Sequence, residues 1–312
     1  MMKKYWLLPV MAGMLLSCHN TRHLRSGTTA VKVLKDPTGW VTDTLSPGLI
    51  HYHFAGYYTP SAASQNVNVI EVDLNNPRYQ LKIAEVRPSD SLSAVAARIP
   101  GALAAINGSY FEIVDGLYSG FFKSDDTIRT QVTIPKDHRL FWKHDAAFYY
   151  DTAQQTAGIL YGNNESYNQL RYANVVSASP MLIYQYKPVG ETFAKPRHTP
   201  LDSLDYEDPD RHQGVRHPRT AIALTSHKQV LLITVDGRDK QAAGMSAREL
   251  TQFIQHYFRP EHALNLDGGG STTLWIKNAN TPTGVVNYPT DNKRFDHFGQ
   301  RKIRNYITVV EK

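Results

Sequence analysis

The chain of 312 residues contains a single cysteine, Cys18, so it cannot form an internal disulfide. It also lacks a large excess of charge of either sign, since it contains 34 lysines and arginines and 28 aspartates and glutamates. The formal net charge of +6 is mild, and no compact basic run is interleaved with aromatic residues. We therefore predict no nucleic-acid partner, whereas an anionic substrate would suit this balance.

Several sequence motifs of catalysis are absent. No His-Glu-x-x-His pattern accompanies the 13 histidines, no lysine follows the glycine run, and Ser271 does not sit in a Gly-x-Ser-x-Gly elbow. We predict no catalytic metal, no nucleotide or other cofactor, and no serine nucleophile. The acidic region 201–214 lacks the EF-hand pattern and is interrupted by Pro209, which favours a solvated loop and leaves calcium binding open.

The N-terminus has the features of an export signal. Two lysines precede an apolar stretch over 5–16, which is too short for a comfortable membrane span, and Ser17 follows it. The string Leu15-Leu-Ser-Cys18 resembles the lipobox of bacterial lipoproteins, in which the signal is cut before the cysteine and the thiol carries lipid. The alternative is an ordinary secretory signal with an incidental cysteine. We predict a lipid-anchored protein of a bacterial cell envelope, periplasmic or surface-exposed.

The rest of the chain divides into a tether and one folded domain. Residues 1–17 are the predicted signal, 18–47 the lipidated cysteine with a polar tether, and 48–312 the domain. Alternating or buried apolar patterns predict strands at 66–74, 79–86, 102–106, 140–151, 173–186, 220–226, 229–235, 263–266 and 302–310. Helical spacing predicts helices at 89–99 and 246–258. These elements predict an α+β fold, a single domain with a mixed, strand-rich sheet core and a few flanking helices.

The stretch 263–275, Ala-Leu-Asn-Leu-Asp-Gly-Gly-Gly-Ser-Thr-Thr-Leu-Trp, is the most informative one. Asp267 stands where a short buried strand ends and three glycines begin, and glycines let a ligand approach the main chain. A carboxylate beside bare amides and hydroxyls can handle a polar substrate. The alternative is a tight hairpin whose aspartate caps a turn.

Three further segments also place a polar group at the end of an apolar run. They are Ala105-Ile-Asn-Gly-Ser-Tyr-Phe111, Pro218-Arg-Thr-Ala-Ile-Ala-Leu224 and Ile233-Thr-Val-Asp-Gly-Arg238. Together with the stretch 263–275 and with Arg301-Lys-Ile-Arg-Asn305, they closely resemble the phosphodiester glycosidase family over about residues 65–310. An animal member of that family removes N-acetylglucosamine from a mannose 6-phosphate diester. The region 202–214 is longer than the family pattern leads us to expect, which predicts a differently shaped substrate pocket.

The resemblance implies a reaction that splits a sugar from a phosphodiester, so the substrate is an anionic carbohydrate. Arginine suits the phosphate because its planar fork can donate two hydrogen bonds. The candidates are Arg219, Arg238 and Arg301, with Arg304 as an alternative to Arg301. The departing phosphate monoester needs little protonation, so arginines can partly replace the general acid of ordinary glycosidases.

The same reaction requires a carboxylate that activates water or supports an oxocarbenium-like centre. Asp267 is the first candidate and Asp236 the second, although Asp236 can instead hold the turn at Gly237. Asn107 is either a substrate-orienting amide or a turn residue. The remaining candidate substrate-binding residues are Thr220, Gly268, Gly269, Gly270, Ser271, Thr272 and Asn305.

The sequence therefore predicts hydrolysis of a sugar-1-phosphodiester in a glycan, glycolipid or cell-wall polymer. Two alternatives stay open. The first is a non-catalytic glycan-binding lipoprotein, for which the 18 tyrosines, 11 phenylalanines and 4 tryptophans could form a sugar-stacking platform. The second is a phosphodiesterase that cuts the P–O bond with the same residues.

Overall fold

The computed structural model describes residues 33–111, 113–114, 117–190 and 200–312. Strands dominate this part of the chain. In chain order they are β1 (Trp40–Ser46), β2 (Leu49–Tyr58), β3 (Ala63–Asp73), β4 (Tyr79–Asp90), β5 (Ala102–Asn107), β6 (Ile113–Val114), β7 (Leu117–Tyr118), β8 (Phe122–Ser124), β9 (Thr127–Thr130), β10 (Ala146–Asp151), β11 (Thr156–Tyr161), β12 (Asn174–Ala178), β13 (Met181–Ile183), β14 (Arg219–Leu224), β15 (Gln229–Val235), β16 (His262–Asn265), β17 (Leu274–Ile276) and β18 (Ile303–Glu311). The α-helices are α1 (Leu92–Ala96), α2 (Asn164–Gln169), α3 (Pro209–Gly214) and α4 (Ala247–Tyr257).

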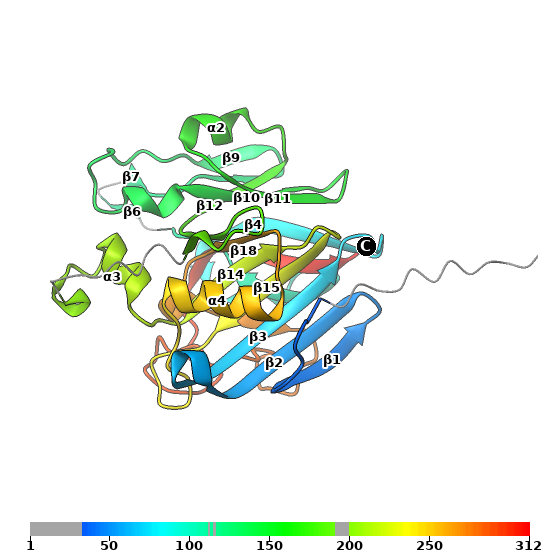
Figure 1. The fold of residues 1–312 in the computed structure, drawn as a ribbon. Helices are drawn as coiled ribbons and strands as arrows, with labels where there is room; N and C mark the ends of the chain where they lie inside the picture. The colour runs from blue at the N-terminus through cyan, green and yellow to red at the C-terminus, as the bar shows by residue number, and fades with distance from the viewer. Residues whose placement is uncertain (1–32, 112, 115–116, 191–199) are drawn as a thin grey trace, which may run out of the picture. The chain divides into compact units, whose positions relative to one another are not determined.

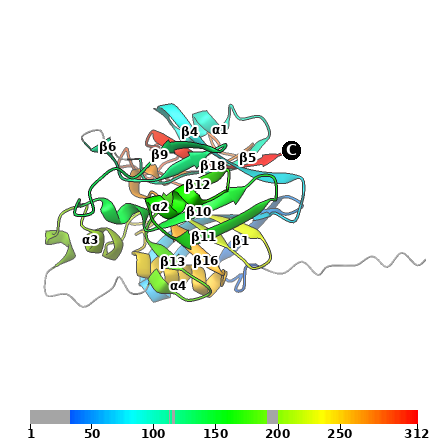
Figure 2. The same ribbon diagram turned by 90° about the horizontal axis from the view of Figure 1, so that it is seen from above.

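The strands form three main sheets and one short hairpin of β6 and β7. The largest sheet has seven strands in the order β1-β2-β3-β15-β14-β16-β13. A five-stranded sheet has the order β11-β10-β12-β8-β9, and a four-stranded sheet has the order β17-β5-β18-β4. Figures 1 and 2 show the five-stranded sheet stacked beside the larger one, with β10, β11 and β12 next to one another.

One hydrophobic core joins the three sheets. Ile222 and Leu224 of β14 point into it, together with Ile83 of β4 and Phe148 of β10. The intervening Ala221 and Ala223 of β14 face the opposite side of the sheet, towards α4. Because side chains alternate along a strand, burial on both sides explains why β14 and β15 are almost continuously apolar.

Helix α4 covers the outer face of the seven-stranded sheet, as Figure 1 shows. Its apolar positions, Leu250, Phe253, Ile254 and Tyr257, follow the helical repeat and are all buried. Ser246 caps the first turn, accepting a hydrogen bond from the backbone N–H of Glu249, whose carboxylate accepts one from the backbone N–H of Ser246. The helix therefore forms where the sequence predicts it.

The α+β class and the strand-rich core are confirmed. We predicted a mixed sheet, however, and every pair among the named strands is antiparallel. Antiparallel neighbours need only short connections, whereas parallel neighbours need a crossover that is usually helical. The few helices of this chain fit the antiparallel arrangement.

Three predicted elements differ in the structure. The helix predicted over 89–99 begins only at Leu92 and lasts one turn, because β4 continues through Asp90. The predicted strand 140–151 contains a 3₁₀ turn at Phe141–His144 before β10. The predicted strand 173–186 is divided at Ser179-Pro180 into β12 and β13, which belong to different sheets.

The structure also differs at the predicted start of the domain. Residues 40–46, assigned to the tether by the sequence, form β1 and pair with β2. Val33 and Leu34 are buried as well. The predicted signal and Cys18 lie outside the described residues. Within the part that is described, no helix is long and apolar enough to cross a membrane.

Candidate active site

Antiparallel pairing brings the motif segments to one edge of the fold. Strand β14 lies between β15 and β16 and runs opposite to both, with Arg219 paired to Val235 and Ala221 to Asn265. The start of β14 therefore meets the ends of β15 and β16, where Asp236 and Asp267 follow. In the four-stranded sheet, the end of β5 lies beside the start of β18 for the same reason.

A cavity opens at this edge and collects six of the residues that the sequence predicted for the site. They are Arg219, Arg238, Asp267, Gly268, Gly269 and Arg301. The other predicted residues do not line it. Those are Asn107, Thr220, Asp236, Gly270, Ser271, Thr272 and Asn305.

Arg219 is the deepest of the cationic groups in the wall, with only 1% of its surface exposed. Its Nε donates to the carbonyl of Met245 at 2.9 Å, and its Nη2 donates to the carbonyls of His212 and Val215 at 2.6 and 3.1 Å. Burial lowers the pKa of the guanidinium to about 10, which leaves it charged at neutral pH. Among the described residues, no carboxylate forms an ion pair with it. A buried charge without a counter-ion favours binding of an anion at this place.

Arg238 and Arg301 add two more guanidinium groups to the cavity. Arg238 has a left-handed backbone, with φ of +66°, and donates to the hydroxyl of Tyr206 at 3.3 Å. Arg301 donates from Nε and Nη2 to one oxygen of Asp291 at 3.0 and 2.8 Å. Burial lowers the pKa of Arg301, but Asp291 and Asp267 outweigh it, so the pKa rises overall. The positive charge of the cavity therefore comes from the buried Arg219 and from the more exposed Arg238 and Arg301.

The glycine run forms a tight 3₁₀ turn at Gly269–Ser271. A Cβ atom at Gly268 would lie 2.7 Å from the carbonyl oxygen of Pro218, and Gly269 has φ of +60° with the Arg238 guanidinium 3.1 Å from its ideal Cβ position. Only glycine fits both positions without strain. The N–H of Gly269 is not available to substrate, because it donates to the carbonyl of Pro218 at 2.9 Å, and Gly270 does not line the cavity.

Asp267 lies in the cavity wall, directly after β16. Its backbone is fixed on both sides, because its N–H donates to Gly108 at 3.2 Å and its carbonyl accepts the Asn107 amide at 2.7 Å. Its carboxylate contributes to the raised pKa of Arg301, and the two residues line the same cavity. This carboxylate is thus held beside the cationic groups and open to the cavity.

Asp236 differs from the prediction, because it is buried in the protein interior and does not line the cavity. It is 1% exposed, and its Oδ1 accepts hydrogen bonds from Asn287 Nδ2 at 2.8 Å and the N–H of Tyr288 at 3.0 Å. Its Oδ2 is buried without a hydrogen-bond partner. Burial raises the pKa of this carboxyl to about 7. Through these two hydrogen bonds, Asp236 stabilises the loop at residues 287–288.

The predicted substrate-orienting amides are structural as well. Asn107 Oδ1 accepts from Thr220 Oγ1 at 2.8 Å and from the N–H of Thr273 at 3.1 Å, so it joins three segments behind Asp267. Thr220 also contacts Thr272 at 3.4 Å, and Ser271 is fully buried. These hydroxyls and the Asn107 amide position the cavity wall from behind and do not face its space.

Asn305 and Arg304 line a second cavity, on the other side of Tyr110. Asn305 Oδ1 accepts from the N–H of Ser109 at 2.6 Å, which fixes the turn after β5. A Cβ at Gly108 would lie 2.0 Å from this oxygen. The predicted contact between Asn305 and substrate is therefore not found in the cavity that contains Asp267.

Sequence reasoning missed another group of wall residues. The cavity is also lined by Tyr110, Lys143, Tyr206, Glu207, His212 and His217. Lys143 is 2% exposed, pairs with Glu207 at 2.8 Å and lies 4.9 Å above the Tyr110 ring. Three of these residues come from the region 201–214, and the only signal for them in the sequence was the expectation that 202–214 is longer than the pattern of the family that the chain resembles.

The two histidines remain neutral imidazoles. Burial lowers the pKa of His217 to about 3, with Arg219 and Arg238 acting in the same direction. The pKa of His212 is also well below its usual value, because of burial and then Arg219. Their rings are 5.9 Å apart. They add hydrogen-bonding capacity to the wall and no positive charge at neutral pH.

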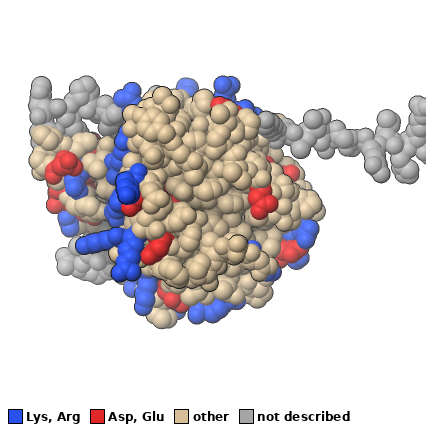
Figure 3. Space-filling model, turned by 90° about the horizontal axis from the view of Figure 1, so that it is seen from below, with Lys and Arg blue, Asp and Glu red and all other residues tan. Residues whose placement is uncertain are grey.

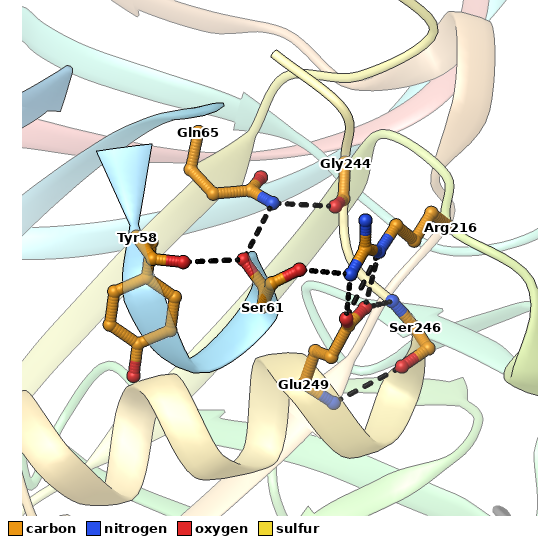
Figure 4. Close-up of polar contacts among 7 residues, drawn as sticks. All are labelled: Tyr58, Ser61, Gln65, Arg216, Gly244, Ser246 and Glu249. Carbon is orange, nitrogen blue, oxygen red and sulfur yellow. Dashed lines mark hydrogen bonds and ion pairs between the residues drawn. The ribbon is translucent and has the colours of Figure 1, made fainter. Parts of the chain in front are cut away.

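A second set of polar contacts holds the segment that carries His217 and Arg219 (Figure 4). Arg216 donates to both oxygens of Glu249, at 2.5 to 3.1 Å, and to the carbonyl of Ser61 at 2.5 Å. Gln65 bridges Ser61 and the carbonyl of Gly244, at 3.3 and 3.0 Å. The start of α4 and the 3₁₀ turn at Thr59–Ser61 are thus tied to the segment that leads into β14.

The acidic residues of the region 201–214 stabilise local structure. Asp208 caps α3, accepting from the N–H groups of Asp210 and Arg211 at 2.8 and 3.3 Å. Asp205 pairs with Arg139 at 3.1 Å. No group of three or more histidine, cysteine, aspartate or glutamate residues suited to a metal ion occurs in the described ranges.

Solved structures share this fold. The catalytic domain of zebrafish N-acetylglucosamine-1-phosphodiester alpha-N-acetylglucosaminidase, auto-inhibited by its pro-peptide, matches with a TM-score of 0.62 and 19% identity over 88% of this chain and 89% of that one. A hypothetical protein from Synechocystis matches with a TM-score of 0.58 and 16% identity, over 88% of this chain and 64% of that one. At these identities the likeness establishes the fold alone.

Sequence comparison gives two further findings. The uncharacterised prophage-derived protein YomE of Bacillus subtilis is 29% identical over 114 residues, which is 32% of this chain and 17% of that protein. This match therefore spans less than a fifth of its relative. The family model for phosphodiester glycosidase matches residues 100–310, which contain every residue of the cavity wall. The chain belongs to the phosphodiester glycosidase family.

Proposed function

We propose that this protein hydrolyses a sugar-1-phosphodiester at the cavity that holds Asp267. Family membership supports the general class of reaction. The observation that carries the proposal is Arg219, a buried guanidinium that opens onto the cavity with no carboxylate partner among the described residues. A phosphodiester supplies the missing negative charge, and Arg238 lies on the same wall to share it.

The proposed reaction breaks the bond between sugar C1 and the bridging oxygen. That oxygen leaves with the phosphate as a monoester, whose negative charge is stabilised by Arg219 and Arg238. Water adds to C1, and its proton passes to solvent or to Asp267. Asp267 either removes that proton or stabilises positive charge at C1.

The conservative variants of the two aspartates test this assignment. Asp267→Asn should lower kcat/KM by about 100-fold or more, because the amide can neither accept the proton nor balance positive charge. Asp236→Asn is the matched comparison and should change kcat/KM only a few-fold, since the amide oxygen keeps both hydrogen bonds of Oδ1. Equal losses in the two variants would contradict a special role for Asp267.

Cleavage in ¹⁸O-labelled water distinguishes the glycosidase from a phosphodiesterase. N-acetylglucosamine-α-phosphodiester is the first substrate to use, and mass spectrometry locates the label. Label in the sugar means that the C–O bond is cut. Label in the phosphate means that the P–O bond is cut and that Asp267 does not act at C1. A non-catalytic glycan-binding protein would release no product, and its Asp267→Asn variant would keep its affinity.

We also propose that the protein is anchored by lipid on Cys18 in a bacterial envelope. The lipobox-like string before Cys18 is the support for this. Expression in a bacterium with radiolabelled palmitate should label the wild type and leave Cys18→Ala unlabelled. A wild-type protein without label would show that the cysteine is incidental.

A further inference from the structure

A second, cationic hollow adjoins the proposed active site. It has a volume of about 400 Å³ and is lined by Arg238, Asp239, Thr290, Asp291, Lys293 and Arg294. Arg238 belongs to both walls, and Asp291 is bonded to Arg301 of the catalytic cavity. Two side-chain links therefore place the hollow directly beside the predicted phosphate-binding arginines.

Three cations of this hollow have no ion-pair partner, whereas six of the fifteen arginines in the described ranges do. Six arginines form ion pairs with carboxylates: Arg78, Arg87, Arg98, Arg139, Arg216 and Arg301. Over the described ranges, Arg238, Lys293 and Arg294 form none. Figure 3 shows lysine and arginine side chains gathered along one side of the molecule when it is viewed from below.

The two carboxylates in the hollow do not cancel its charge. Asp291 pairs with Arg301 at 2.8 Å, and Asp239 accepts the N–H of Gln241 at 2.9 Å. When Arg301 is counted with the lining residues, four cations face two carboxylates, a balance of +2 that the hollow shares with the adjoining cavity. Such a surface attracts a group with more than one negative charge.

A buried hydroxyl gives an independent sign that the hollow receives a polar ligand. Thr290 is only 5% exposed and lines the hollow, yet its Oγ1 is without a hydrogen-bond partner. The loop that carries it is held by the Tyr288 ring, which stacks on Phe295 at 4.1 Å and on His297 at 4.5 Å. The hydroxyl is therefore pre-positioned, and a phosphate oxygen would satisfy it.

Resting on the proposed function, we propose that the hollow binds a second phosphate on the aglycone side of the substrate. The substrate class is then a sugar-1-phosphodiester whose leaving group itself carries phosphate, as in a chain with repeated phosphodiester links. One phosphate lies between Arg219 and Arg238, and the next lies between Arg238 and the Lys293–Arg294 edge. Arg238 serves both.

Binding of two small probes tests the hollow without any turnover. Isothermal titration compares propyl phosphate with propane-1,3-diyl bisphosphate. The wild type should bind the bisphosphate about tenfold more tightly, and the double variant Lys293→Gln/Arg294→Gln should lose this preference. Thr290→Val should reduce it. The control Lys82→Gln/Lys187→Gln removes two exposed lysines that line neither cavity and should keep the preference. Equal binding of the two probes, or a preference unchanged in Lys293→Gln/Arg294→Gln, would overturn the proposal.

Kinetics separate this inference from the proposed function. N-acetylglucosamine-α-phosphodiesters with a methyl, a carboxyalkyl or a phosphoalkyl aglycone are compared, and the phosphoalkyl compound should have the highest kcat/KM. Cleavage of all three at equal rates would leave the proposed function standing and refute the second phosphate site. A bisphosphate preference without cleavage of any sugar phosphodiester would refute the proposed function and leave the site standing.

Discussion

At the scale of single residues, Arg219 carries both structure and predicted chemistry. Its three hydrogen bonds to carbonyl oxygens hold the segment 212–215 and the start of α4 against the cavity. The same guanidinium supplies the deepest positive charge of the wall. A lysine would keep the charge and lose the fork that makes these bonds.

Arg219→Lys should therefore lower both activity and stability. We expect kcat/KM for a sugar phosphodiester to fall about 100-fold, and the free energy of unfolding to fall by about 2 kcal/mol as buried carbonyls lose their donors. Steady-state kinetics and urea unfolding measure the two effects. Loss of stability with full activity would show that Arg219 has only the structural role.

Asp236 predicts a pH dependence of stability. Its folded-state pKa is about 7, against 3.8 for an ordinary aspartate, so the folded protein holds this proton over a range in which the unfolded chain has released it. The contribution of the protonated Asp236 carboxyl to folding stability is fully present below about pH 4 and is lost as the pH rises towards 7. The side chain of Asp236→Asn does not titrate. The free energy of unfolding of this variant should therefore rise relative to that of the wild type by a few kcal/mol between pH 4 and pH 8. Urea unfolding at several pH values measures this. A difference in the free energy of unfolding between the two proteins that stays constant from pH 4 to pH 8 would contradict a raised pKa of Asp236.

Residue types could be predicted from the sequence, but side-chain directions could not. Asp267 and Arg219 follow or precede buried strands, and both face the cavity. Asp236 occupies the same kind of position after β15, and its carboxylate turns inward to Asn287. The Asn107 amide likewise points to Thr220 and Thr273. The side to which a strand-end residue points depends on neighbours that are distant in the chain.

At the scale of elements, β1 is the clearest addition to the sequence-based description. Trp40 at its start packs among the aromatic rings of α4 and β2, with ring centroids 5.2 Å from Tyr257, 5.5 Å from Phe258 and 5.6 Å from Phe54. The neighbouring Val41 is 68% exposed. A single tryptophan in a polar segment gave no periodic pattern to read.

Trp40→Ala should consequently destabilise the domain by about 3 kcal/mol, because it leaves a gap among packed rings. Val41→Ala is the matched control on the same strand and should change the free energy of unfolding by less than about 0.5 kcal/mol. Chemical denaturation of both variants measures this. Similar stability of the two variants would mean that β1 contributes no packing energy to the domain.

Elements with a strong repeat were predictable, and short ones were not. The hairpin of β14 and β15 and the helix α4 have long apolar patterns with clear ends. In contrast, β8 and β9 have three and four residues, and their alternation is too brief to distinguish from a loop. Residues that form such strands do so because neighbouring strands offer hydrogen bonds.

At the scale of the whole molecule, the region 200–214 is joined to the distant residues 141–144 at the cavity. Two contacts connect these segments. Lys143 and Glu207 form an ion pair at 2.8 Å, and Trp142 Nε1 donates a hydrogen bond to the carbonyl of Glu207 at 3.1 Å. Replacing Glu207 removes a carboxylate that lies 2.8 Å from the Lys143 ammonium, and Lys143 is only 2% exposed, so burial of that charge becomes more costly.

Glu207→Gln should therefore weaken the attachment of α3 and its flanking residues, with a cost of about 3 kcal/mol. Faster amide hydrogen exchange in 205–214 and a lower urea midpoint are the expected results. Lys143→Met/Glu207→Leu removes both charges and should recover most of the stability. Unchanged exchange in Glu207→Gln would show that the pair does not hold the segment.

The sequence by itself determined the family, the α+β class and the residue types at the strand ends, because local periodicity and a specific glycine-rich string encode them. Only the tertiary structure decided which carboxylate reaches the cavity, which amides are structural, and that Lys143, Glu207 and His217 complete its wall. The reason is physical. Strand pairing brings together residues more than two hundred positions apart, such as Tyr79 and Glu311, and the direction of each side chain is fixed by those distant partners.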